Sequence, residues 1–108
     1  MSEGAEPLAN RWRGEASLIV AGEIRVLRPS FAALVAAEEE LGALFALVER
    51  AASGQLRIAE LTALFWHCLT NREGLTRDKV GEAIMAVGLA GVAPALRALL
   101  EQILQGAG

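Results

Sequence analysis

Two short runs of alternating apolar and polar residues, between positions 13 and 28, predict a β-hairpin near the start of the chain. The apolar positions are Ala16, Leu18 and Val20 in the first run, and Ile24 and Val26 in the second. Because an isolated two-stranded hairpin is barely stable in water, its apolar face must lie on the rest of the chain. Alternatively, its edges pair with another chain, which would be a means of assembly.

The turn between the two runs determines which residues share a face of the hairpin. A two-residue loop, Ala21-Gly22, pairs Leu18 with Arg25 and mixes apolar and charged residues on both faces. A three-residue loop, 20–22, pairs Leu18 with Ile24 and lets Gly22 adopt the left-handed conformation of a bulged turn. We favour the three-residue loop because it keeps the apolar residues paired with one another.

Beyond Pro29 the apolar residues recur every three or four positions, which predicts amphipathic helices. The expected ranges are about 31–41, 43–53, 58–71, 77–87 and 92–104. Ser30 and Thr76 are suitable N-caps, and Gly42 and Gly88 are natural helix ends. Pro94 is tolerated because it falls in the first turn of the last helix.

One apolar stripe on each helix is expected to face a common core. These stripes comprise Phe31, Leu34, Val35 and Leu41; Leu44, Phe45, Leu47 and Val48; Ile58, Leu61, Leu64, Phe65, Cys68 and Leu69; Val80, Ala83, Ile84 and Val87; and Val92, Leu96, Leu99, Leu100, Ile103 and Leu104. The predicted fold class is therefore α+β and mostly α, with an N-terminal β-hairpin followed by about five short helices in one small bundle. We expect residues 1–10 to form a flexible N-terminal tail and residues 11–105 to form a single domain.

Length and charge narrow the class of protein. A chain of 108 residues is long enough for one domain with its own core. The net charge is −3, so nothing indicates a nucleic-acid binder. A mild local excess of arginine near the N-terminus is interpreted as a solvated face; it consists of Arg11, Arg13, Arg25 and Arg28, partly offset by Glu15 and Glu23.

The cysteine content and the hydropathy indicate where the protein works. One cysteine, Cys68, excludes an intrachain disulfide and fits a reducing, cytoplasmic setting. The first residues contain no apolar stretch typical of a signal sequence. No window approaches the roughly 20 apolar residues of a membrane span, so we expect no membrane association.

Candidate chemistry is sparse. The sequence has no phosphate-binding glycine loop and no Cys or His spacing suited to zinc. His67 and Cys68 are adjacent, but neighbouring helical residues point about 100° apart, so they do not face each other. We interpret Cys68 as a buried thiol and His67 as a surface residue on the side of Glu60. We therefore expect no catalytic residues, no cofactor and no enzyme activity.

The acidic run 38–40 lies at the end of the first predicted helix. Its carboxylates fan out around the helix, which favours a solvated charge cluster over a metal site. Negative charge at a helix C-terminus is mildly unfavourable. The run therefore suggests a basic neighbour, such as a hairpin arginine, although solvation alone would also account for it.

Five residues are candidates for binding a protein partner: Trp12, Trp66, Leu96, Leu100 and Leu104. Tryptophan is enriched at binding hot spots. Trp12 either anchors the start of the hairpin on the helices or is exposed and binds a partner. Trp66 lies about 100° from its helix's apolar stripe, so either that helix is buried nearly all round, which we favour, or Trp66 faces a boundary or partner. The wide apolar face of the last helix belongs to the core or to a groove-filling surface, and we favour the core.

The order of motifs resembles a known family. The segment Asn10-Arg11-Trp12-Arg13-Gly14-Glu15 precedes the hairpin, which ends in Leu27-Arg28-Pro29. The strings FAAL and AEEELG follow in the first helix, and LRIAEL opens the third. Over residues 10–105 the chain resembles the small tail proteins of gene transfer agents and long-tailed phages. Members are described as tail assembly chaperones, and sometimes labelled tail tube proteins.

The resemblance implies a role in building a phage-like tail. Its implied partners are the tape-measure protein and the tail tube protein. A chaperone of this kind would cover apolar helical segments of the tape measure until tube subunits replace the chaperone. The alternatives are a structural tail component retained in the particle and a small helical interaction domain of unrelated role. Tube subunits usually build rings from extended β-structure, so one hairpin and five helices argue against a tube subunit. A homo-oligomer is also compatible with the sequence.

Overall fold

The computed structural model describes residues 15–106. Within that range two strands precede five helices, as the sequence predicted. The elements are β1 (Ala16–Val20), β2 (Glu23–Leu27), α1 (Phe31–Leu41), α2 (Leu44–Ala52), α3 (Ile58–Cys68), α4 (Arg77–Val87) and α5 (Leu89–Gln105). The predicted tail, 1–10, and Trp12 lie outside the described residues.

Most helix ends lie where the capping residues predicted them. The hydroxyls of Ser30 and Thr76 accept hydrogen bonds from the third backbone N–H of α1 and α4, each at 3.2 Å. Gly42 and Gly88 end these helices with φ of 87° and 91°. The predicted start of the last helix at Val92 was wrong, because α5 begins directly after Gly88 at Leu89. Pro94 therefore lies in the second turn of α5 rather than the first.

The hairpin has the two-residue loop, so the predicted three-residue register was wrong. Leu18 pairs with Arg25, and Ile19 with Ile24. Both loop residues have positive φ, 52° at Ala21 and 82° at Gly22, which is the turn type whose twist matches antiparallel strands.

Arg25 can share a face with Leu18 because loop carbonyls accept hydrogen bonds from its guanidinium and Glu23 forms an ion pair with it at 3.2 Å. Its guanidinium donates to the carbonyl oxygens of Asn71 at 3.2 Å and Glu73 at 3.0 Å, in the segment between α3 and α4. The Arg25 side chain is therefore largely covered, contrary to the predicted solvated arginine face. Arg28 also has a defined partner, the buried carboxylate of Glu15.

The outer edge of β2 is partly covered by the chain itself. Residues after α3 turn extended, so that Leu69 pairs with Leu27 in an antiparallel bridge. Thr70 donates its N–H to the carbonyl of Val26 at 3.0 Å, on the same edge. This pairing ends α3 at Cys68, earlier than the predicted residue 71. The hairpin is thus anchored through both its edge and its inner face, since β1 packs on α4 and α5.

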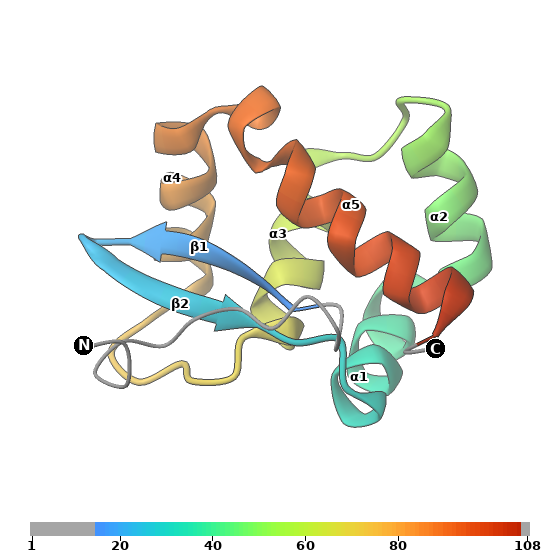
Figure 1. Ribbon diagram of the computed structural model, residues 1–108, viewed down its shortest axis with the longest axis horizontal. Helices are drawn as coiled ribbons and strands as arrows, with labels where there is room; N and C mark the ends of the chain where they lie inside the picture. The colour runs from blue at the N-terminus through green and yellow to red at the C-terminus, as the bar shows by residue number, and fades with distance from the viewer. Residues whose placement is uncertain (1–14, 107–108) are drawn as a thin grey trace, which may run out of the picture.

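Helix α3 lies at the centre of the bundle, with α1 and α4 packed on opposite sides (Figure 1). Its Leu64 and Phe65 are fully buried. Cys68, at the end of the same helix, is also fully buried. The other large side chains that are fully buried come from the two strands and from the helices around α3: Val20, Leu27, Leu47, Val80, Ile84 and Leu99. All of these buried residues except Val20 and Leu27, which lie in the strands, belong to the predicted helix stripes.

Several predicted core positions are exposed instead. Phe31 is 85% exposed and Phe45 is 71% exposed, and Val35, Ile58, Val87 and Leu104 are also open to solvent. In α1 the buried residues are the alanines Ala33 and Ala37. Small side chains at a contact let two helices approach closely, so α1 turns its alanine face, rather than its phenylalanine, toward the interior.

Candidate protein-binding surface

The acidic run at the end of α1 has specific partners. Glu38 accepts a hydrogen bond from the N–H of Leu44 at 3.1 Å, which caps the start of α2 where Ala43 offers no side-chain acceptor. Glu40 binds both terminal nitrogens of Arg77, in α4, at 2.6 and 2.7 Å. The expected basic neighbour therefore exists, but it is not a hairpin arginine.

Electrostatics favour the Glu40–Arg77 pair. An acidic residue at the end of α1 and a basic residue at the start of α4 are each unfavourable for their own helix dipole, and pairing offsets both effects. Nε2 of His67 lies 2.8 Å from Oε1 of Glu40 as a third member of the cluster. Hydrogen bonds from Arg77 and His67 lower the pKa of Glu40 to about 2, and the bond to Glu40 raises the pKa of Arg77. The carboxylate thus stays ionised at any physiological pH.

Trp66 is half-buried at the edge of the core, although α3 is the central helix. The guanidinium groups of Arg72 and Arg77 lie 5.2 and 5.9 Å from its ring centroid, within cation–π range. Arg72 also donates to the carbonyls of Trp66 and His67 at the end of α3, at 3.0 and 3.2 Å. The ring is therefore held by the chain's own arginines, and a partner contact at Trp66 stays a prediction.

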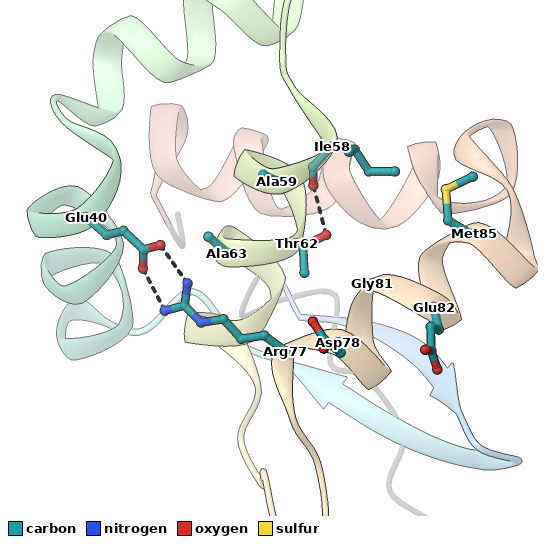
Figure 2. Close-up of a pocket in the computed structure, with 10 residues that line it drawn as sticks. All are labelled: Glu40, Ile58, Ala59, Thr62, Ala63, Arg77, Asp78, Gly81, Glu82 and Met85. Carbon is teal, nitrogen blue, oxygen red and sulfur yellow. Dashed lines mark hydrogen bonds and ion pairs between the residues drawn. The ribbon is translucent and has the colours of Figure 1, made fainter.

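A groove of about 650 Å³ lies between α3 and α4, beside the Glu40–Arg77 pair (Figure 2). Its floor consists of small residues: Ala59, Thr62 and Ala63 from α3, and Gly81 from α4. The hydroxyl of Thr62 donates to the carbonyl of Ile58 at 2.8 Å, so this polar group is satisfied within its own helix. The volume is within the range of known ligand-binding pockets.

The walls of the groove are apolar and its rim is acidic. Ile58 and Met85, which is 57% exposed, stand at the end away from Glu40 (Figure 2). Asp78 and Glu82, one helical turn apart on α4, also line the groove. Neither carboxylate has an ion-pair partner within residues 15–106. The groove therefore combines an unfilled apolar surface with unneutralised negative charge.

The predicted apolar stripes included only Ile58 of this groove and placed it in the core, because the floor of the groove lacks large apolar residues. Two signals in the sequence could have located it. Ala59 and Ala63 are four residues apart and so share a helix face. Gly81 lies inside a helix, where glycine is unfavourable and usually has a packing or functional reason.

Helix α5 presents little of its predicted partner-binding face. Leu96 and Leu100 are half-buried, and Leu96 packs against the core. Of the three predicted residues only Leu104 is open, at 53%. Val92 and Leu99 are buried, which confirms that this helix contributes to the core. Partner contacts through Leu96, Leu100 and Leu104 remain untested predictions.

The hairpin offers another exposed apolar patch. Ile19 and Ile24 face each other across the strands on the side away from the helices, and both are exposed. Phe31 and Val35 form a further pair one turn apart on α1. These two pairs add exposed apolar side chains to those at the α3–α4 groove.

The His67–Cys68 pair is not arranged as a nucleophile and base. Burial raises the pKa of the Cys68 thiol to about 12, so the thiolate is scarce at neutral pH. His67 is directed to Glu40 on a neighbouring helix. Within the described residues, no group of three or more His, Cys, Asp or Glu side chains is placed to hold a metal ion.

Among residues 15–106 no single helix is both long and apolar enough to cross a membrane. Helices α4 and α5 reach that length and composition only as a pair, and they meet at a bend of 115°.

The fold and its surface define a small hairpin-and-helix domain whose exposed features suit contacts with other proteins. Residues 13–106 match the family described as "Phage tail tube protein, GTA-gp10". Because the match covers most of the chain, the chain belongs to this family, and its role is related to the tail of a phage or gene transfer agent. No curated protein matches the chain, and no solved structure does.

Proposed function

We propose that this protein is an assembly chaperone or adaptor of a phage-like tail, which binds the tape-measure protein, the tail tube protein or both while the tail is built. The observation that carries the proposal is the exposure of apolar surface at the α3–α4 groove, the hairpin and α1. A protein that must cover apolar segments of another chain needs such surface. The proposal includes a cytoplasmic setting, which suits a single reduced cysteine.

The small amount of β-structure supports a chaperone over a ring-forming tube subunit. The two strands have five residues each, and part of the outer edge of β2 is already paired with residues 69 and 70. Subunits that join through sheet edges need unpaired N–H and C=O groups along a strand. The C-terminal end of β2 is therefore not available for such pairing.

The alternative is a structural component retained in the finished particle. The family description, which names a tail tube protein, favours this alternative. It predicts a constant copy number per particle, whereas a chaperone leaves when assembly is complete.

A titration of the purified protein with the tape-measure and tail tube proteins of the same phage-like particle tests the proposal. We expect saturable binding to at least one of them. Heat-denatured protein and a charge-matched soluble protein serve as controls for non-specific association. No binding to either protein would contradict the chaperone role.

A further inference from the structure

We propose that the α3–α4 groove binds a short amphipathic helix of the partner, with apolar side chains in the groove and basic side chains along its acidic rim. This inference rests on the proposed function, because it assigns the surface and the partner segment through which the protein would act. It commits to a helix with lysine or arginine beside its apolar stripe.

The groove has the shape that inserted side chains require. A Cβ atom added at Gly81 would lie 3.7 Å from the side chain of Thr62, which is an ordinary contact distance, so the floor accepts a small side chain at this position without a clash. Ile58 and Met85 extend beside the floor and leave large apolar areas in contact with water. Covering these areas would provide the hydrophobic driving force for binding.

The surroundings of the groove favour a helix over a strand. A partner strand binds mainly through backbone hydrogen bonds to a free sheet edge. Here both sides of the groove are helices, which offer no sheet edge for such pairing. A partner must therefore bind through its side chains, and a helix presents several of them on one face at intervals of three or four residues.

The charges around the groove favour a basic partner. Arg77 neutralises Glu40 at one end, so the remaining charge of the lining comes from Asp78 and Glu82. Their spacing places both carboxylates along one side of α4. Complementary charge at an interface rim increases the association rate and disfavours wrongly charged partners.

Two peptides and two variants of the groove test the proposal. The first peptide is an amphipathic helix with a leucine stripe flanked by lysines, and in the second each lysine is replaced by glutamate. Gly81→Leu fills the groove at a position where φ is not positive and leucine is the better helix former. Glu82→Lys, at an exposed site, tests the charge without altering packing. Gly81→Ala, Phe45→Gln at an exposed apolar site on α2, and Glu101→Lys are the matched controls.

We expect the lysine peptide to bind the wild-type protein, and Gly81→Leu and Glu82→Lys to weaken that binding by at least about tenfold. The three controls should bind as the wild type does, and the glutamate peptide should bind at least about tenfold more weakly. Circular dichroism establishes that each variant is folded; if Gly81→Leu is not, Met85→Gln replaces it.

Equal affinity for both peptides, no binding of the lysine peptide, or binding unaffected by the groove variants would overturn the proposal. So would self-association of the protein that Gly81→Leu abolishes, because a second copy would then be the occupant. If the tape-measure or tube protein binds wild type and Gly81→Leu equally, the groove assignment fails and the chaperone role stands. If neither protein binds at all, the chaperone role fails.

Discussion

Glu40, in the last turn of α1, and Arg77, in the first turn of α4, form a doubly hydrogen-bonded ion pair that joins two helices on opposite sides of α3. The pair closes one end of the α3–α4 groove (Figure 2). It also brings Arg77 near the Trp66 ring. One ion pair thus links the packing of three helices to the shape and charge of the candidate binding surface.

Replacing Glu40 with glutamine should destabilise the fold in a pH-dependent way. The pKa of Glu40 is lowered from 4.5 to about 2 in the folded state, so its contribution is complete above pH 4.5 and is lost as the pH falls toward 2. Because the Glu40 side chain is 37% exposed, solvent screens the pair, and we expect a loss of about 1 kcal/mol or less at pH 7.

Urea unfolding of wild type and Glu40→Gln at pH 7 and at pH 2.5 measures this difference. Glu39→Gln is the matched control, since Glu39 is the adjacent exposed carboxylate and has no ion-pair partner within residues 15–106. A difference between Glu40→Gln and wild type that is as large in acid as at neutral pH would contradict the role assigned to the ion pair.

Two phenylalanines should differ sharply in their effect on stability. Phe65 is fully buried, so Phe65→Ala should cost about 3–5 kcal/mol of unfolding free energy. Phe31 is exposed, so Phe31→Ala should change stability by no more than about 0.5 kcal/mol. Thermal unfolding of both variants measures the contrast. A loss of stability for Phe31→Ala comparable with that for Phe65→Ala would instead support the predicted orientation of α1, in which Phe31 faces the core.

The sequence predicted the elements better than the faces of the elements. Ser30 and Thr76 located helix starts because capping depends on hydrogen bonds within a few residues. Periodicity could not decide which face of α1 is buried, since its alanines and its larger apolar residues lie on different faces. The choice depends on how closely α1 approaches α3, which is set by the whole bundle.

The hairpin register was missed for a similar reason. Pairing Leu18 with Arg25 looks unfavourable until the carbonyls of Asn71 and Glu73 are brought near, more than forty residues further along the chain. The α3–α4 groove was missed because the small residues of its floor leave no hydrophobic stripe. Both features arise from contacts between distant segments, which local pattern does not encode.

Replacing Ala21 with asparagine should stabilise the hairpin. Ala21 has φ of 52°, a conformation that costs a residue with a Cβ about 1–2 kcal/mol, whereas asparagine tolerates it. We expect a gain of about 0.5–1 kcal/mol, measured as a higher melting temperature. In a three-residue loop Ala21 would have negative φ, so an unchanged or lower melting temperature would favour that register instead.

The thiol of Cys68 should be unreactive in the folded protein. It is 1% exposed, and burial raises its pKa to about 12. We expect no labelling by a thiol reagent at pH 8 under native conditions, and one label per chain once urea unfolds the protein. Mass spectrometry counts the labels. Rapid labelling of native protein would reveal an accessible thiolate and reopen the possibility of chemistry at His67 and Cys68.

Quantitative mass spectrometry of purified tail particles tests the central claim most directly, because it separates a chaperone from a retained component. The number of copies per particle is compared with that of the tail tube subunit and with the amount in unassembled cell extract. The proposed role predicts that this protein is abundant in the extract and absent or strongly depleted in particles. A constant number of copies per particle, in fixed ratio to the tube subunit, would contradict it.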